Sequence, residues 1–110
     1  EDGDPLDILV VKPLPVLPGC VIRARPLGVL LMSDEKGVDE KILAVPVDAL
    51  NPYYANVKSY DELPPLMIAQ IAHFFRHYKD LEPGKSASVG EWAPLEKAHE
   101  RIKLAIERHA

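Results

Sequence analysis

The sequence has one cysteine, no long apolar run and no excess of positive charge, and each shortage excludes a class of protein. Cys20 has no partner for an internal disulfide or a Cys-x-x-Cys redox pair, which favours a reducing, cytoplasmic location. No uninterrupted apolar stretch is long enough to span a membrane, so we expect no membrane association. Because 17 acidic residues outnumber 13 basic ones, we expect no nucleic-acid partner.

The remaining composition predicts one small folded domain. The 110 residues are 47% hydrophobic, enough for one sheet covered by one or two helices. The formal charge of −4 is concentrated at the beginning of the sequence, where Glu1, Asp2, Asp4 and Asp7 have no basic neighbour. Residues 8–110 are then electrically balanced, so this first segment is the most unusual part of the chain.

Alternating and β-branched residues predict three strands in the first half of the sequence. A short strand over 8–11 is followed by a Pro-rich loop in which Cys20 is expected to be a small buried hydrophobe. A long kinked strand follows over 21–32, with a bulge at Gly28. An acidic loop over 33–40 then connects it to a strand over 41–47, as in a wide hairpin.

The second half changes to a helical period. Pro64 and Pro65 suit the first turn of a helix that ends before Pro83, a weak edge strand is expected over 86–92, and a second helix over 93–109. The expected buried faces are Leu66, Ile68, Ile71, Ala72 and Phe75 on the first helix, and Leu95, Ala98, Ile102, Ala105 and Ile106 on the second. The order of elements predicts an α+β fold with an antiparallel, barrel-like sheet.

The segment Asp2-Gly3-Asp4-Pro5-Leu6-Asp7 places three carboxylates within six residues. They repel one another unless a cation lies among them, and oxygen ligands of this kind select Mg²⁺, Mn²⁺ or Ca²⁺. An EF-hand is excluded because Asp7 and Pro13 stand where its loop needs Gly and Glu. A solvated acidic turn explains the composition equally well.

A second acidic cluster lies in the loop 33–41, which by itself resembles an ordinary surface hairpin loop. If both clusters converged, they could hold several divalent ions, an arrangement suited to displacement at phosphorus. Lys41, Tyr78 and Lys79 could supply the contacts that a phosphate needs.

Together these residues resemble the soluble family I inorganic pyrophosphatases of the bacterial type. The signature Asp-Gly-Asp-Pro-x-Asp is matched by residues 2–7, and the likeness extends over nearly the whole chain. Further matching segments are 18–22, 25–30, 32–35, 39–41, 70–75 and 77–82.

The resemblance implies an OB-like five-stranded barrel with flanking helices, and Mg²⁺-dependent hydrolysis of diphosphate to two phosphates, with Mn²⁺ as a possible substitute. The positions that match the family's metal ligands are Asp2, Asp7, Asp34 and Asp39. By the same resemblance Asp4 accepts a proton from the attacking water, and Lys41, Tyr78 and Lys79 contact phosphate. This agrees with the general chemistry, in which metal ions make a water acidic and a nearby carboxylate accepts its proton.

The sequence departs from the family at its beginning. Family members carry a sizeable segment with further phosphate-binding residues before the acidic motif, and this sequence starts at the motif. We therefore expect residues 1–110 to be the C-terminal portion of one pyrophosphatase domain and to be nearly inactive alone. The alternative is a folded, catalytically inert module that only binds metal or oligomerises. The family also implies a homohexamer.

The spacing of His73 and His77 resembles that of a zinc helix, but Phe74 stands where such proteases need Glu. A subunit contact and two ordinary surface histidines remain the two interpretations of this pair.

Overall fold

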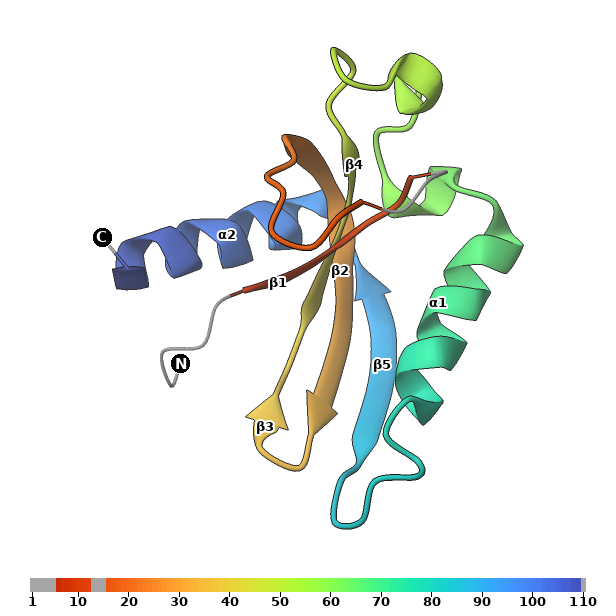
Figure 1. Cartoon of the computed structure of the whole chain (residues 1–110), viewed down its shortest axis with the longest axis vertical. Helices are drawn as coiled ribbons and strands as arrows, with labels where there is room; N and C mark the ends of the chain where they lie inside the picture. The colour runs from red at the N-terminus through yellow and green to blue at the C-terminus, as the bar shows by residue number, and fades with distance from the viewer. Residues whose placement is uncertain (1–5, 13–15, 110) are drawn as a thin grey trace.

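The computed structural model describes residues 6–12 and 16–109, which form a curled mixed sheet with two α-helices (Figure 1). The strands are β1 (Asp7–Val10), β2 (Ala24–Asp34), β3 (Gly37–Val38), β4 (Lys41–Pro46) and β5 (Ala87–Ala93). The helices are α1 (Pro65–His77) and α2 (Leu95–His109), and two short 3₁₀ turns, η1 (Pro52–Tyr54) and η2 (Tyr60–Glu62), precede α1. No helix in the described residues is long and apolar enough to cross a membrane.

The α+β half-barrel confirms the expected fold class, and one strand pair differs from the expected antiparallel pattern. The long strand β2 pairs antiparallel with β3, β4 and β5. Strand β1 pairs with β4 in parallel, with Asp7 opposite Lys41. The chain reverses direction twice between these two strands, so their direct pairing has to be parallel, which the sequence pattern did not show.

The hairpin between β2 and β4 is tighter than the expected wide loop over 33–40. Strand β2 continues to Asp34, and β3 begins at Gly37. The turn between them uses the positive φ of Gly37, 121°, which a residue with a Cβ rarely adopts. The acidic residues of this loop are therefore held close to the ends of regular strands.

The bulge expected at Gly28 is confirmed by a shift in register between Pro26 and Gly28. The extra residue, Leu27, packs in the same cluster as Leu43, whereas Val29 packs with Ile42 in the other cluster. A regular strand would place residues 27 and 29 on one face. The bulge thus allows β2 to contribute to both cores.

Gly28 also permits close approach of neighbouring backbone. A Cβ built on this residue would lie 2.7 Å from the carbonyl oxygen of Ala93 and 2.8 Å from Cδ1 of Tyr60. We expect Gly28→Ala to lower the free energy of unfolding by about 1–3 kcal/mol, because the backbone of β5 has to move. Urea denaturation monitored by circular dichroism measures this. Gly90→Ala, whose Cβ would lie 3.2 Å from the carbonyl oxygen of Leu31, is the milder comparison and should cost less; an unchanged midpoint for Gly28→Ala would contradict the prediction.

The two helices cover separate hydrophobic clusters. Met67, Ile68 and Ile71 of α1 pack against the cluster that contains Leu27 and Leu43. On α2, Ala98 is buried within the second cluster, with Leu95 and Ile102 against it. Figure 1 shows α1 beside β5, and α2 extending away from the sheet toward its C-terminal end.

Three expected buried residues are instead exposed. Leu66 is 69% exposed because α1 packs against the first cluster through Met67, together with the expected Ile68 and Ile71. Ile106 is 64% exposed, and the residues of α2 that pack in the second cluster are Leu95, Ala98 and Ile102. Cys20 is exposed in a turn closed by its own amide and the carbonyl oxygen of Leu17.

Candidate functional site

The first part of the candidate site surrounds Lys41, the first residue of β4. Its Nζ lies 2.7 Å from Oδ2 of Asp7 and 3.1 Å from either carboxylate oxygen of Asp39. The parallel register brings Asp7, the first residue of β1, beside Lys41, and the Phe75 ring of α1 lies 5.7 Å from the same nitrogen. Three elements therefore converge on one ammonium group whose side chain is only 12% exposed.

The charge state of Lys41 follows from this environment. Burial disfavours the charged form, but hydrogen bonds and attraction from Asp7 and Asp39 outweigh it, so the pKa of Lys41 lies above its ordinary value. The side chain therefore remains an ammonium throughout the neutral pH range, and two carboxylates are fixed toward the same positive charge.

The second part of the site joins the end of β2 to the residues that follow α1. Lys79 Nζ lies 3.1 Å from Oδ2 of Asp34 and 3.6 Å from Oε1 of Glu35. The Tyr78 ring lies 5.6 Å from the same nitrogen. Residues 45 positions apart in the chain are thus brought into direct contact.

The ionisation of this second group is also set by its neighbours. The backbone amide of Lys36, 2.9 Å from Oδ1, lowers the pKa of Asp34, and Lys79 adds to this effect. The bond to Asp34 raises the pKa of Lys79. The backbone amide of Ser86 lowers the pKa of Glu35. Both members of the Asp34–Lys79 pair are therefore charged at neutral pH.

An aromatic contact connects the two groups. The Phe75 and Tyr78 rings are 5.4 Å apart at an angle of 82°, and each lies near one of the two lysines. The structure thus brings Asp7, Asp39 and Lys41 together near the Phe75 ring, and Asp34 and Lys79 together near the Tyr78 ring. The remaining two residues singled out from the sequence, Asp2 and Asp4, lie outside the described residues.

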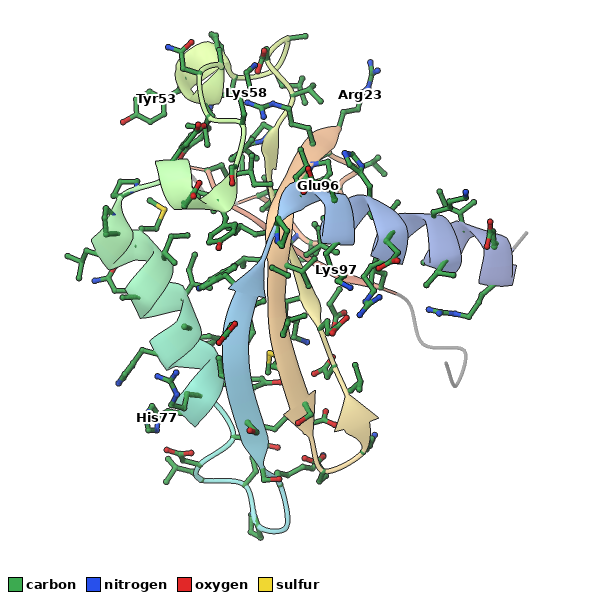
Figure 2. The ribbon with its side chains drawn as sticks, turned by 180° about the vertical axis from the view of Figure 1, so that it is seen from behind. Arg23, Tyr53, Lys58, His77, Glu96 and Lys97 are labelled. Atoms are coloured by element: carbon green, nitrogen blue, oxygen red, sulfur yellow. The ribbon has the colours of Figure 1, made fainter. Side chains whose placement is uncertain are left out.

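Within residues 6–12 and 16–109, no three His, Cys, Asp or Glu side chains are grouped closely enough to hold a metal ion. His73 and His77 do stack on α1, with ring centroids 4.6 Å apart, and His77 Nδ1 lies 2.8 Å from Oδ2 of Asp80. Figure 2 shows His77 at the C-terminal end of α1, away from the sheet. The described histidines thus have no third ligand of the kind a zinc site needs.

Two supporting acids were not predicted from the sequence. Glu35 contacts Lys79 and accepts a hydrogen bond from the amide of Ser86, and Glu40 is paired with Arg101 of α2. Both glutamates were visible only as members of an acidic loop. Their partners are 44 to 61 positions further along the chain, at Lys79, Ser86 and Arg101, and no local spacing indicates such pairs.

The fold and the two acid–lysine groups define the chain as an α+β half-barrel protein with a charged site at the strand ends. The sequence model described as inorganic pyrophosphatase matches residues 1–110, so the chain belongs to the inorganic pyrophosphatase family. The inorganic pyrophosphatase of Caulobacter vibrioides is 57% identical over 109 residues, 99% of this chain and 62% of that protein. The Pseudomonas aeruginosa inorganic pyrophosphatase is 55% identical, over 96% of this chain and 61% of that protein.

Solved structures agree with this assignment. The inorganic phosphatase of Anaplasma phagocytophilum has a TM-score of 0.94 at 50% identity, over 97% of this chain and 63% of that one. An inorganic pyrophosphatase from Coxiella burnetii has a TM-score of 0.95 at 45% identity, over 98% of this chain and 64% of that one. The chain therefore spans somewhat less than two thirds of the length of the relatives it matches.

Proposed function

We propose that this chain is the C-terminal portion of an inorganic diphosphatase, which hydrolyses diphosphate to two phosphates with the help of divalent metal ions. The observation that carries the proposal is the family match over residues 1–110, which includes every residue of the candidate site. The two charged lysines are consistent with it, because ammonium groups held near carboxylates suit a substrate that is itself a metal-bound polyanion.

The donor chemistry of the site fits a hard divalent cation such as Mg²⁺ or Mn²⁺. Asp7 and Asp39 already direct oxygen atoms toward one positive charge, that of Lys41. We propose Asp2 as the further ligand beside them, and Asp34 as a ligand that engages when substrate arrives. When bound, the metal supplies positive charge that acidifies a water and offsets the charge on phosphate.

The remaining roles follow from the chemistry of each side chain. In this proposal Asp4 accepts a proton from the attacking water. Lys41, Tyr78 and Lys79 donate hydrogen bonds to phosphate oxygens, and their cationic members stay protonated at neutral pH for the reasons given above. We further propose that the whole enzyme is cytoplasmic and assembles as a homohexamer.

The competing proposal is a folded but inert module that binds metal or oligomerises. To separate the two, residues 1–110 can be compared with a chimera, called here the extended chimera, that adds the unmatched part of the Caulobacter vibrioides relative. We expect phosphate release from diphosphate by the extended chimera only when Mg²⁺ is present, and almost none by residues 1–110. Rapid release by residues 1–110 alone would contradict the proposed inactivity, and an inactive extended chimera would favour the inert module.

In the extended chimera, Lys79→Ala should raise KM for diphosphate by about 10-fold to 100-fold, because a charge-assisted hydrogen bond to substrate is lost. The Mg²⁺ concentration for half-maximal activity should change much less than KM, since a lysine does not bind a cation and Asp34 keeps its hydrogen bond from the amide of Lys36. Lys103→Ala, at an exposed position of α2, is the matched control. Steady-state phosphate release measures both quantities. An unchanged KM in Lys79→Ala would show that Lys79 does not contact the substrate.

A further inference from the structure

Helix α2 contacts Glu40, the residue between two members of the candidate site in the sequence. Arg101 of α2 donates from Nε to Oε1 of Glu40, and its Nη2 lies 3.4 Å from Oε2 of the same carboxylate. Glu40 stands between Asp39 and Lys41, and its side chain is only 14% exposed. A guanidinium that contacts both carboxylate oxygens restrains the orientation of the acid as well as its distance.

The guanidinium is itself held in place. Its Nη1 lies 3.3 Å from Oε1 of Glu100, and that oxygen is 3.4 Å from Nζ of Lys97. The same helix is anchored through Ala98, which is fully buried against the cluster containing Val29 and Ile42. Figure 2 shows Lys97 near the part of α2 that crosses the sheet. Arg101 therefore connects Glu40 to a packed element rather than to a free side chain.

The backbone on either side of Glu40 is restrained by β2. The amide of Asp39 donates to the carbonyl oxygen of Met32 at 3.0 Å, and Lys41 pairs with Leu30. Side chains alternate along an extended segment. Asp39 and Lys41 accordingly meet each other, while Glu40 is directed toward α2. Because Glu40 links Asp39 to Lys41, the contact from Arg101 restrains the backbone between these two site residues.

We propose that Arg101 is a positioning residue of the site, which through Glu40 sets the backbone that presents Asp39 to the metal and Lys41 to phosphate. The inference rests on the proposed function. Without Arg101, Glu40 becomes a largely buried carboxylate without its partner, and the segment 39–41 relaxes to expose it to water. Substitution of a residue that orients a metal ligand indirectly typically lowers metal affinity or activity by about 10-fold to 100-fold.

The test measures Mn²⁺ affinity of residues 1–110 by calorimetry, KM and kcat of the extended chimera, and the melting temperature of each protein. We expect Arg101→Met to weaken Mn²⁺ binding and raise KM by about 10-fold at temperatures where the protein is fully folded. Arg101→Lys should recover only part of this loss, because lysine keeps the charge but lacks the two-pronged geometry. Arg108→Met, at an exposed position of the last turn of α2, is the matched control and should leave both values unchanged.

Two outcomes overturn the inference. If Arg101→Met melts at a lower temperature but binds Mn²⁺ and diphosphate as the wild type does, Arg101 stabilises the fold and positions nothing. If Arg101→Met does not fold, Arg101→Lys and Glu40→Gln are measured in its place. Wild-type Mn²⁺ affinity and KM in both of these variants would reject the proposal. Failure of the proposed function looks different: the wild-type extended chimera itself would then release no phosphate.

Discussion

Replacing Asp4 with Asn in the extended chimera should lower kcat by about 10²-fold to 10⁴-fold while leaving Mn²⁺ affinity mostly intact. An asparagine keeps the shape of the side chain but cannot accept a proton at neutral pH, and this range is typical for the loss of a general base. Steady-state kinetics and a Mn²⁺ titration on the same preparation measure the two quantities.

Asp7→Asn is the comparison that distinguishes a base from a ligand. It should lose both kcat and metal affinity, because Asp7 is proposed to bind the metal directly. It also removes one of the two charges that hold Lys41. If Asp4→Asn weakened Mn²⁺ binding as much as Asp7→Asn, Asp4 would be better described as a further ligand.

The largest effect on stability is expected from Leu43→Ala, which should lower the free energy of unfolding by about 2–5 kcal/mol. Leu43 is only 1% exposed and packs among Leu27 and Val45 in the cluster that α1 covers. Removing its side chain leaves a cavity in the middle of β4, where the flanking strands are fixed by hydrogen bonds. Urea denaturation of residues 1–110 measures the loss.

Leu66→Ala is the matched control, because it makes the same change at a leucine of α1 that is 69% exposed. Its cost should stay within about 0.5 kcal/mol, as for most surface substitutions. A small loss in Leu43→Ala would contradict the prediction, and a large loss in Leu66→Ala would mean that Leu66 is buried, as expected from the sequence, and not exposed as in the structure.

Much of the fold could be predicted because it depends on local signals. The prolines before α1, the kink near Gly28 and the 3.6-residue period of α2 each act over a few residues, and each is confirmed. Which residue at the start of α1 is buried does not follow from such a local signal. Leu66 and Met67 are both apolar, and only the shape of the underlying sheet decides which one is buried.

The candidate site could be predicted only in part for the same reason. Its residues were found from a resemblance, and the structure brings Asp7, Asp39 and Lys41 together through the parallel pairing of β1 with β4. That pairing joins segments 34 positions apart and leaves no local trace in the sequence. The Arg101–Glu40 contact spans an even longer separation and was missed altogether.

The parallel pairing of β1 with β4 also has a consequence for the order of folding. Strand β4 can pair with β2 through a short turn, whereas β1 has to close a loop of more than 30 residues before its first contact with β4 forms. Closing such a loop costs entropy before any contact repays it, so non-local pairings form slowly. We therefore expect β1 to dock after the β2–β4 hairpin. The ammonium of Lys41 would acquire its Asp7 partner only in this late step, so the charged site is completed after the sheet that supports it.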